Sequence, residues 1–191
     1  VGRLIGKIDS RLIIGAGLLV TAVSLYEMSG FTPDVPASTI VRTGFMQGLG
    51  FGLIFVPLST VTFATLPPEW RTDATGLFSL MRNLGSSIGI SIVVSLLASN
   101  TQANHAEIAA NLSPFNAELH APAIHDHWNA WSAAGQASLD GVVNVQAQII
   151  AYADDYRLMM FLTLAALPTL LLMRKPGRQV PGGPAHAAVA D

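Results

Sequence analysis

The sequence predicts an all-α membrane protein with four transmembrane helices. Charged residues make up 12% of the 191 residues, against ~25% in typical soluble domains. Apolar residues reach 51%, and the mean hydropathy is +0.48. These residues gather in runs long enough to cross a ~30 Å hydrocarbon core, which requires about 20 helical residues. The composition therefore excludes an intrinsically disordered chain.

Four apolar runs are long enough to span a membrane, and each has few charges. They occupy residues 12–29, 40–66, 75–98 and 156–173. The first is uncharged until Glu27, and the others carry Arg42, Arg82 and Arg157, respectively. A soluble four-helix bundle is the alternative, but its helices would keep a charged face, and these runs have none. Helices surrounded by lipid or protein are therefore expected.

Lysine and arginine in the connecting segments predict the orientation of the chain. These segments are residues 1–11, 30–39, 67–74, 99–155 and 174–191. The first, third and last contain Lys or Arg, whereas residues 30–39 and 99–155 contain neither. Cytoplasmic loops retain positive charge. We therefore expect both ends of this segment in the cytoplasm, a long outer loop at 99–155 and a disordered tail at 174–191.

Glycines recur every four residues in the second and third runs. They are Gly44, Gly48 and Gly52 in one run, and Gly85 and Gly89 in the other. Residues four apart lie on one helix face, and small residues there allow another helix to approach closely. The pattern predicts helix packing, and the alternative is that these faces line a moving interface or a substrate path. Pro57 is expected to kink the second helix.

Arg82 is the most informative polar residue within the runs. An arginine at the centre of a membrane helix costs ~2.5–3.5 kcal/mol on insertion scales. It shares a helix face with Ser79, Ser86 and the two glycines, so we expect it to face the helix bundle. The alternative is that its side chain reaches back to the nearby interface, which is the expectation for Arg42 and Arg157. With Arg82, the candidate residues for transport or gating are Gln47, Asn83 and Pro57.

The long segment 99–155 gives no sign of an enzyme or a metal site. It contains four histidines, at 105, 120, 125 and 127, but a zinc site needs three or four ligands in fixed geometry, and the chain has no Cys. Residues 105–112 and 141–152 have weak helical character. Phosphate-binding and hydrolase motifs are absent from the sequence. The net charge of −2 gives no indication of nucleic-acid binding. We expect no metal and no enzyme activity.

Several motifs resemble those of major facilitator transporters. GRLIGKIDSR at residues 2–11 is similar to a cytoplasmic loop motif of that superfamily, with Gly2, Arg3, Asp9 and Arg11 as its site residues, although Gly6 stands where Asp is common. Residues 44–92 resemble the EmrB/QacA subfamily of fourteen-span drug:proton antiporters. The most specific parts are LPPE at 66–69, AxGL at 74–77 and RxLGSxxG at 82–89.

The resemblance implies the last four of fourteen spans, from the C-terminal half of a major facilitator fold. It implies proton-driven export of amphipathic drugs by alternating access, without a cofactor, in the inner membrane. Membrane lipid and drug substrates would be its partners, with a periplasmic adaptor and an outer-membrane channel in a Gram-negative organism. The chain begins with Val1, which favours a fragment. We expect that such a fragment alone transports nothing, because the substrate path lies between the two halves of the fold and one half is largely missing. The alternatives are a four-span scaffold protein and an exporter of a non-drug metabolite.

Overall fold

The computed structural model describes residues 9–64, 66–112 and 132–172, and these residues form helices without any strand. Five α-helices and a short 3-10 helix are described. They are α1 (Ser10–Met28), α2 (Ala37–Ala64), η1 (Pro68–Trp70), α3 (Arg71–Asn111), α5 (Ala133–Ala165) and α6 (Thr169–Leu172). The predicted all-α class is confirmed.

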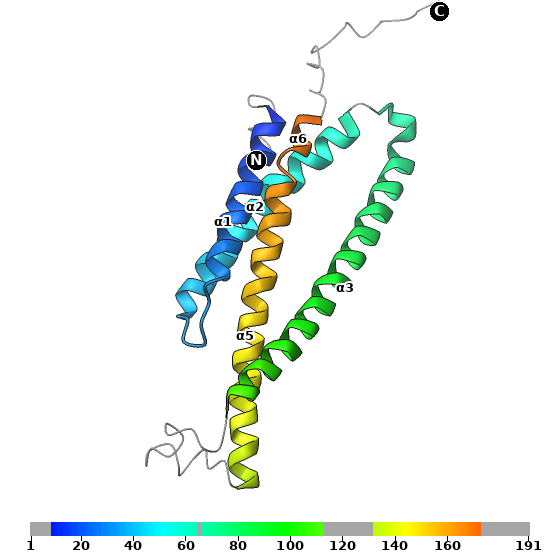
Figure 1. Cartoon of the computed structure of the whole chain (residues 1–191). Coiled ribbons are helices and arrows are strands. Elements are labelled where there is room, and N and C mark those ends of the chain that lie inside the picture. Colours follow the sequence, from blue (N-terminus) through cyan, green and yellow to red (C-terminus); the bar gives the residue numbers. More distant parts are fainter. Residues whose placement is uncertain (1–8, 65, 113–131, 173–191) are drawn as a thin grey trace, which may run out of the picture.

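Helices α1 and α2 form the most closely packed pair (Figure 1). The side chain of Asp9 caps α1 by accepting a hydrogen bond from the Arg11 backbone nitrogen at 3.3 Å. The two helices approach closely at Gly17 and Gly50, where a Cβ atom on Gly17 would lie 2.9 Å from the Gly50 carbonyl oxygen. Only glycine fits such a distance, so this crossing depends on both residues.

Helix α3 is much longer than the span expected from the sequence. Its 41 residues measure about 60 Å at 1.5 Å per residue, about twice the ~30 Å thickness of the hydrocarbon core. It begins at Arg71, so η1 and α3 occupy most of the expected turn at residues 67–74. Figure 1 shows α3 running apart from α1 and α2 and meeting α5 near its own C-terminal end.

Much of the expected outer loop is helical. Within residues 99–155, α3 continues to Asn111, and α5 starts at Ala133 after Ser132, whose side chain accepts a hydrogen bond from the Gly135 nitrogen at 3.0 Å. The physical reason is packing, because α3 and α5 cover each other there. The polar composition that predicted a loop instead belongs to two exposed helices, of which α5 buries one narrow stripe. Residues 113–131 lie outside the described part of the chain.

Three described helices are long and apolar enough to cross a membrane: Ser10–Met28, Ala37–Phe63 and Pro68–Asn111. They correspond to the first three expected spans. The expected fourth span, residues 156–173, falls in the last part of α5 and in α6, with Met173 outside the described residues. Asp154, Asp155 and Arg157 lie in the same helix and lower its apolar character. The fourth span stays a prediction.

Candidate functional site

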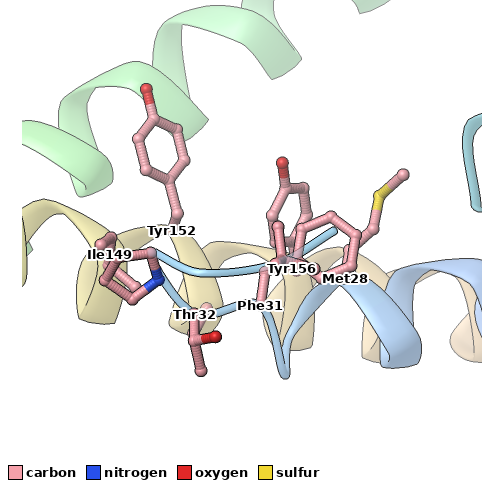
Figure 2. Close-up of a pocket in the computed structure, with 9 residues that line it drawn as sticks. Met28, Phe31, Thr32, Ile149, Tyr152 and Tyr156 are labelled. Atoms are coloured by element: carbon pink, nitrogen blue, oxygen red, sulfur yellow. The ribbon is translucent and has the colours of Figure 1, made fainter. Parts of the chain in front are cut away.

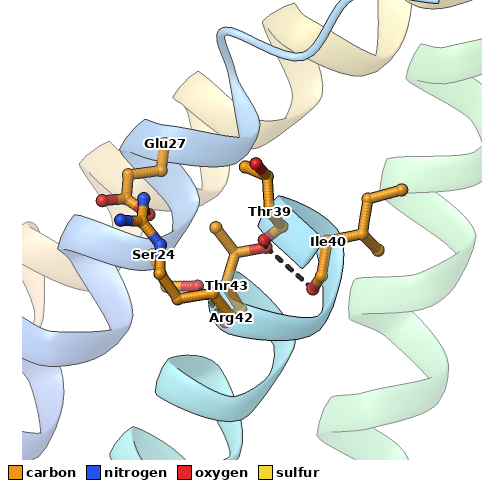
Figure 3. A network of polar contacts seen from close by, with 6 residues as sticks. All are labelled: Ser24, Glu27, Thr39, Ile40, Arg42 and Thr43. Carbon is orange, nitrogen blue, oxygen red and sulfur yellow. Dashed lines mark hydrogen bonds and ion pairs between the residues drawn. The ribbon is translucent and has the colours of Figure 1, made fainter. Parts of the chain in front are cut away.

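The α1–α2 interface contains a small buried polar network (Figure 3). The Ser24 hydroxyl donates a hydrogen bond to the Thr43 carbonyl oxygen at 2.8 Å, and neither residue is exposed. The Thr43 hydroxyl lies 3.0 Å from two carbonyl oxygens of its own helix, those of Thr39 and Ile40. Every hydroxyl in the network has an acceptor, so the network links the helices and leaves no free group for chemistry.

The exposed arginines that sequence reasoning placed near helix ends are paired with carboxylates. Arg42 on α2 lies 2.9 Å from a carboxylate oxygen of Glu27 on α1. Arg157 lies 3.4 Å from Asp154, one turn earlier in α5. Both pairs are largely open to solvent, where an ion pair contributes ~0–1 kcal/mol. They hold local geometry and are not candidates for a binding site.

Arg82 faces the space between α2 and α3. Its guanidinium carbon lies 5.3 Å from the centre of the Phe55 ring on α2, which is a cation–π distance. Nearer the η1 turn, Phe63 and Phe78 make an edge-to-face contact with centroids 5.6 Å apart. Arg82 has no carboxylate within 4 Å among the described residues. Its positive charge is therefore balanced here only by an aromatic face.

A shallow groove runs along α3, on a face that does not include Arg82. It encloses about 770 Å³ and is open on one side. Its lining alternates polar and apolar residues: Asn83, Ser86, Ser87, Ile90, Ser91, Val94, Ser95 and Ala98. Asn83 was predicted, whereas most of the serines were missed. The sequence does contain a pattern that indicates them. One ridge of the helix, at a spacing of four residues, is polar: Ser79, Asn83, Ser87, Ser91 and Ser95.

The glycines predicted to pack lie on open faces within the described chain. A Cβ atom added at Gly44, Gly48, Gly52, Gly85 or Gly89 would meet no atom within 4 Å. The close helix crossing uses Gly17 and Gly50 instead, which sequence reasoning did not select. Gly50 lies between members of the four-residue pattern, on the face that turns toward α1. The role of the open glycines stays a prediction.

The remaining candidate residues are dispersed. Gln47 is half-buried in α2, ten residues before Pro57, whose side chain is buried inside the same helix. Of the cytoplasmic loop motif, Asp9 caps α1 and Arg11 is half-buried at its start, at the far end of α1 from the α1–α2 connection. Gly2 and Arg3 lie outside the described residues.

Histidines form no cluster in the described part of the chain. His105 on α3 lies 2.9 Å from a carboxylate oxygen of Asp140, and this contact joins α3 to α5. The other three loop histidines, at 120, 125 and 127, fall outside the described residues. Within residues 9–64, 66–112 and 132–172, no three His, Asp or Glu side chains are close enough together to hold a metal ion.

Comparison with known proteins identifies relatives that align with nearly the whole chain. The fatty acid resistance protein FarB of Neisseria gonorrhoeae is 27% identical over 96% of this chain and 36% of its own length. The probable multidrug resistance protein EmrY of Escherichia coli is 27% identical over 92% of this chain and 35% of its own. The E. coli multidrug export protein EmrB is 31% identical over a shorter stretch, 61% of this chain and 23% of its own length.

The chain thus spans about a third of the length of FarB and EmrY. No solved structure matches the chain. The model of the Major Facilitator Superfamily matches residues 1–105, more than half of the chain. The chain's described apolar helices, three of which are long enough to cross a membrane, agree with a multi-pass membrane protein. The chain belongs to the major facilitator superfamily and is similar to its EmrB/QacA-type exporters.

Proposed function

We propose that the chain is the C-terminal part of a proton-driven multidrug efflux transporter that works by alternating access. The observation that carries the proposal is the resemblance of 92% of the chain to a probable multidrug resistance protein. The α3 groove supports it, because mixed polar and apolar side chains along a membrane helix suit an amphipathic molecule. The energy source is the proton gradient, and no cofactor is required.

The transporter lies in the inner membrane, with both ends of this segment in the cytoplasm. The absence of Lys and Arg from residues 30–39 and 99–155 supports this orientation. The parts of α3 and α5 beyond the spans then project outward as two packed helices joined by the contact between His105 and Asp140. In a Gram-negative organism, these helices are the expected docking surface for a periplasmic adaptor, which connects to an outer-membrane channel.

Substitution of Arg82 provides the sharpest test of the proposed transport function. In the full-length protein, Arg82→Ala removes the charge from the space between α2 and α3, and we expect it to abolish drug resistance while the protein remains in the membrane. Arg82→Lys keeps the charge and is expected to retain part of the resistance. Arg71→Ala, at the exposed start of α3, is the matched control and should leave resistance intact. Unchanged resistance in Arg82→Ala would mean that Arg82 has no role in transport.

A second candidate substrate class is long-chain carboxylates. It is favoured by the relative named for fatty acid resistance, which aligns with 96% of this chain, and by the absence of a described carboxylate beside Arg82. A guanidinium that contacts an aromatic ring but no described carboxylate can still pair with an anionic head group. Proteoliposomes holding the full-length protein, loaded with either a labelled fatty acid or a cationic dye, distinguish the two. Anion export that is lost in Arg82→Ala favours this candidate.

The 191-residue chain alone is expected to transport nothing, because the central path lies between two halves of the fold. Proteoliposomes containing only this chain test the point, and proton-coupled efflux from them would contradict it. A four-span scaffold protein is the remaining alternative. It would form stable dimers through the open glycine faces and have no effect on resistance when deleted.

A further inference from the structure

One stripe of α5 is buried, and it ends in a carboxylic acid. Val143, Ala147, Ala151 and Asp155 follow at a spacing of four, so they lie along one ridge of the helix. Both alanines are fully buried, and Asp155 is 4% exposed. The Oδ2 atom of Asp155 is buried and has no hydrogen-bond partner. An apolar interface thus contains one ionisable group whose oxygen nothing in the described chain satisfies.

The nearby charged groups do not neutralise Asp155. On α5, Arg157 is paired with Asp154. On α1, which packs against α5, Glu27 is paired with Arg42, Tyr26 is exposed, and Arg11 lies at the opposite end of the helix.

Helix α3 also packs against α5, but its titratable groups lie far from Asp155. His105 and Glu107 lie beside the earlier part of α5, where His105 contacts Asp140. Asp140 is fifteen residues before Asp155, about 22 Å along the helix. Among the described residues, no cation therefore lies close enough to Asp155 to keep its carboxylate ionised.

Burial and charge both favour the protonated form of this acid. Burial raises the pKa of Asp155, and the negative charge of neighbouring Asp154 raises it further. An ionised carboxylate in an apolar interface loses its hydration without compensation, whereas the neutral acid has a much smaller cost. Asp155 precedes the expected fourth span, at the end of the helices where α1 connects to α2.

We propose that Asp155 is a proton-binding site in the interface between α5 and α1, neutral when the interface is closed. A cavity of about 190 Å³ lies at the same level of α5 but on a neighbouring face, and residues of α5, the end of α1 and the α1–α2 connection line it. Tyr152 and Tyr156, three residues before Asp155 and one after it, contribute their rings to this cavity and are stacked with centroids 6.5 Å apart (Figure 2).

The proton site rests on the burial, contacts and charges of the described residues, and only its use in coupling proton entry to export rests on the proposed function. A carboxyl that is neutral in the closed interface and ionises when the interface opens would link helix movement to proton release. Its position near the expected outer side would place that exchange with the outer solution. The test below involves no substrate, so its result does not depend on whether the protein exports drugs.

The test is the pH dependence of thermal unfolding of the purified full-length protein in detergent. A native pKa above that of the unfolded chain means that the folded state binds more protons. The stabilisation is complete at acidic pH, below the unfolded pKa, and is lost as pH rises through the folded pKa. Asp155→Asn imitates the neutral acid. Its melting temperature should match the wild type at acidic pH and exceed it at higher pH.

Asp154→Asn is the matched control, because it removes the neighbouring charge and keeps Asp155. Its profile should retain the pH-dependent fall in stability but shift it to lower pH. The proposal is overturned if Asp155→Asn has the pH profile of the wild type. It is also overturned if that variant is less stable at every pH, which would mean that an ionised Asp155 pairs with a cation.

A second measurement, on the wild type and Asp155→Glu, keeps the proposal testable if Asp155→Asn does not fold. In the wild type, the infrared carbonyl band of a protonated carboxylic acid should disappear as pH rises, and Asp155→Glu should shift the frequency of that band. A band that Asp155→Glu leaves unchanged belongs to another residue and overturns the assignment.

Discussion

Replacing Gly50 by alanine tests the close crossing of α1 and α2. A Cβ atom at this position would contact the Thr21 hydroxyl oxygen and lie 3.0 Å from the Gly17 carbonyl oxygen and 3.1 Å from the Thr21 nitrogen. Two of these three atoms belong to the backbone of α1, so no side-chain rotation removes the clash. The helices must separate by a few tenths of an ångström, and the contacts on either side loosen with them.

The expected magnitude follows from two opposing terms. Alanine in a helix interior is favoured over glycine by roughly 0.5–1 kcal/mol. Overpacking of a well-packed interface costs about 1–3 kcal/mol, and backbone contacts place Gly50 in the upper part of that range. The net loss is then about 2 kcal/mol, or about a thirtyfold change in the unfolding equilibrium.

The assay is reversible unfolding of the full-length protein in mixed micelles, followed by circular dichroism. Gly141→Ala in α5 is the matched control, because its added Cβ would meet no atom within 4 Å and only the propensity term applies. Thr21→Ala removes the nearest contact, so the double variant should lose less stability than the sum of the two single variants. Equal stability of Gly50→Ala and Gly141→Ala, or strict additivity, would refute the reasoning.

Three further predictions concern the same helices. Ser24→Ala deletes the hydrogen bond to the Thr43 carbonyl, and unfolding in micelles should show a loss of about 1 kcal/mol, with Ser24→Thr as the control that retains a hydroxyl. Arg42→Ala breaks an exposed ion pair and should cost less than about 1 kcal/mol, a difference that disappears in high salt. If another helix packs on the open glycine face, Gly48→Leu should reduce folding yield more than Leu53→Ala, and equal yields would count against that packing.

The helical class could be predicted from the sequence, and so could three helices that are long and apolar enough to cross a membrane. Their signal is local, because residues 12–29, 40–66 and 75–98 each contain an apolar run long enough for a membrane and very few charges. Arg82 could also be singled out from the sequence, because an arginine in such a run needs a polar or aromatic partner. Its contact with Phe55, a residue of the preceding helix, was not visible, because helical periodicity does not say which face meets which.

The extent of α3 and α5 could not be predicted from composition. Residues 99–112 and 132–155 look like parts of a polar loop because most of their side chains are exposed, and the helices they form pack against each other through few residues. Sequence reasoning assigned no role to Asp155. Its burial depends on the neighbouring helix, so no local pattern indicated that its carboxyl is enclosed.

The sequence by itself determined that this chain crosses a membrane as helices and which superfamily it resembles, because hydropathy and short motifs are properties of neighbouring residues. Tertiary structure alone decided which glycines form the crossing, Gly17 and Gly50 and not the regular series, and which acid is buried. Both depend on atoms brought together from distant parts of the chain. Close approach and desolvation each require two packed surfaces. The residue pattern of a single helix specifies only one of those surfaces.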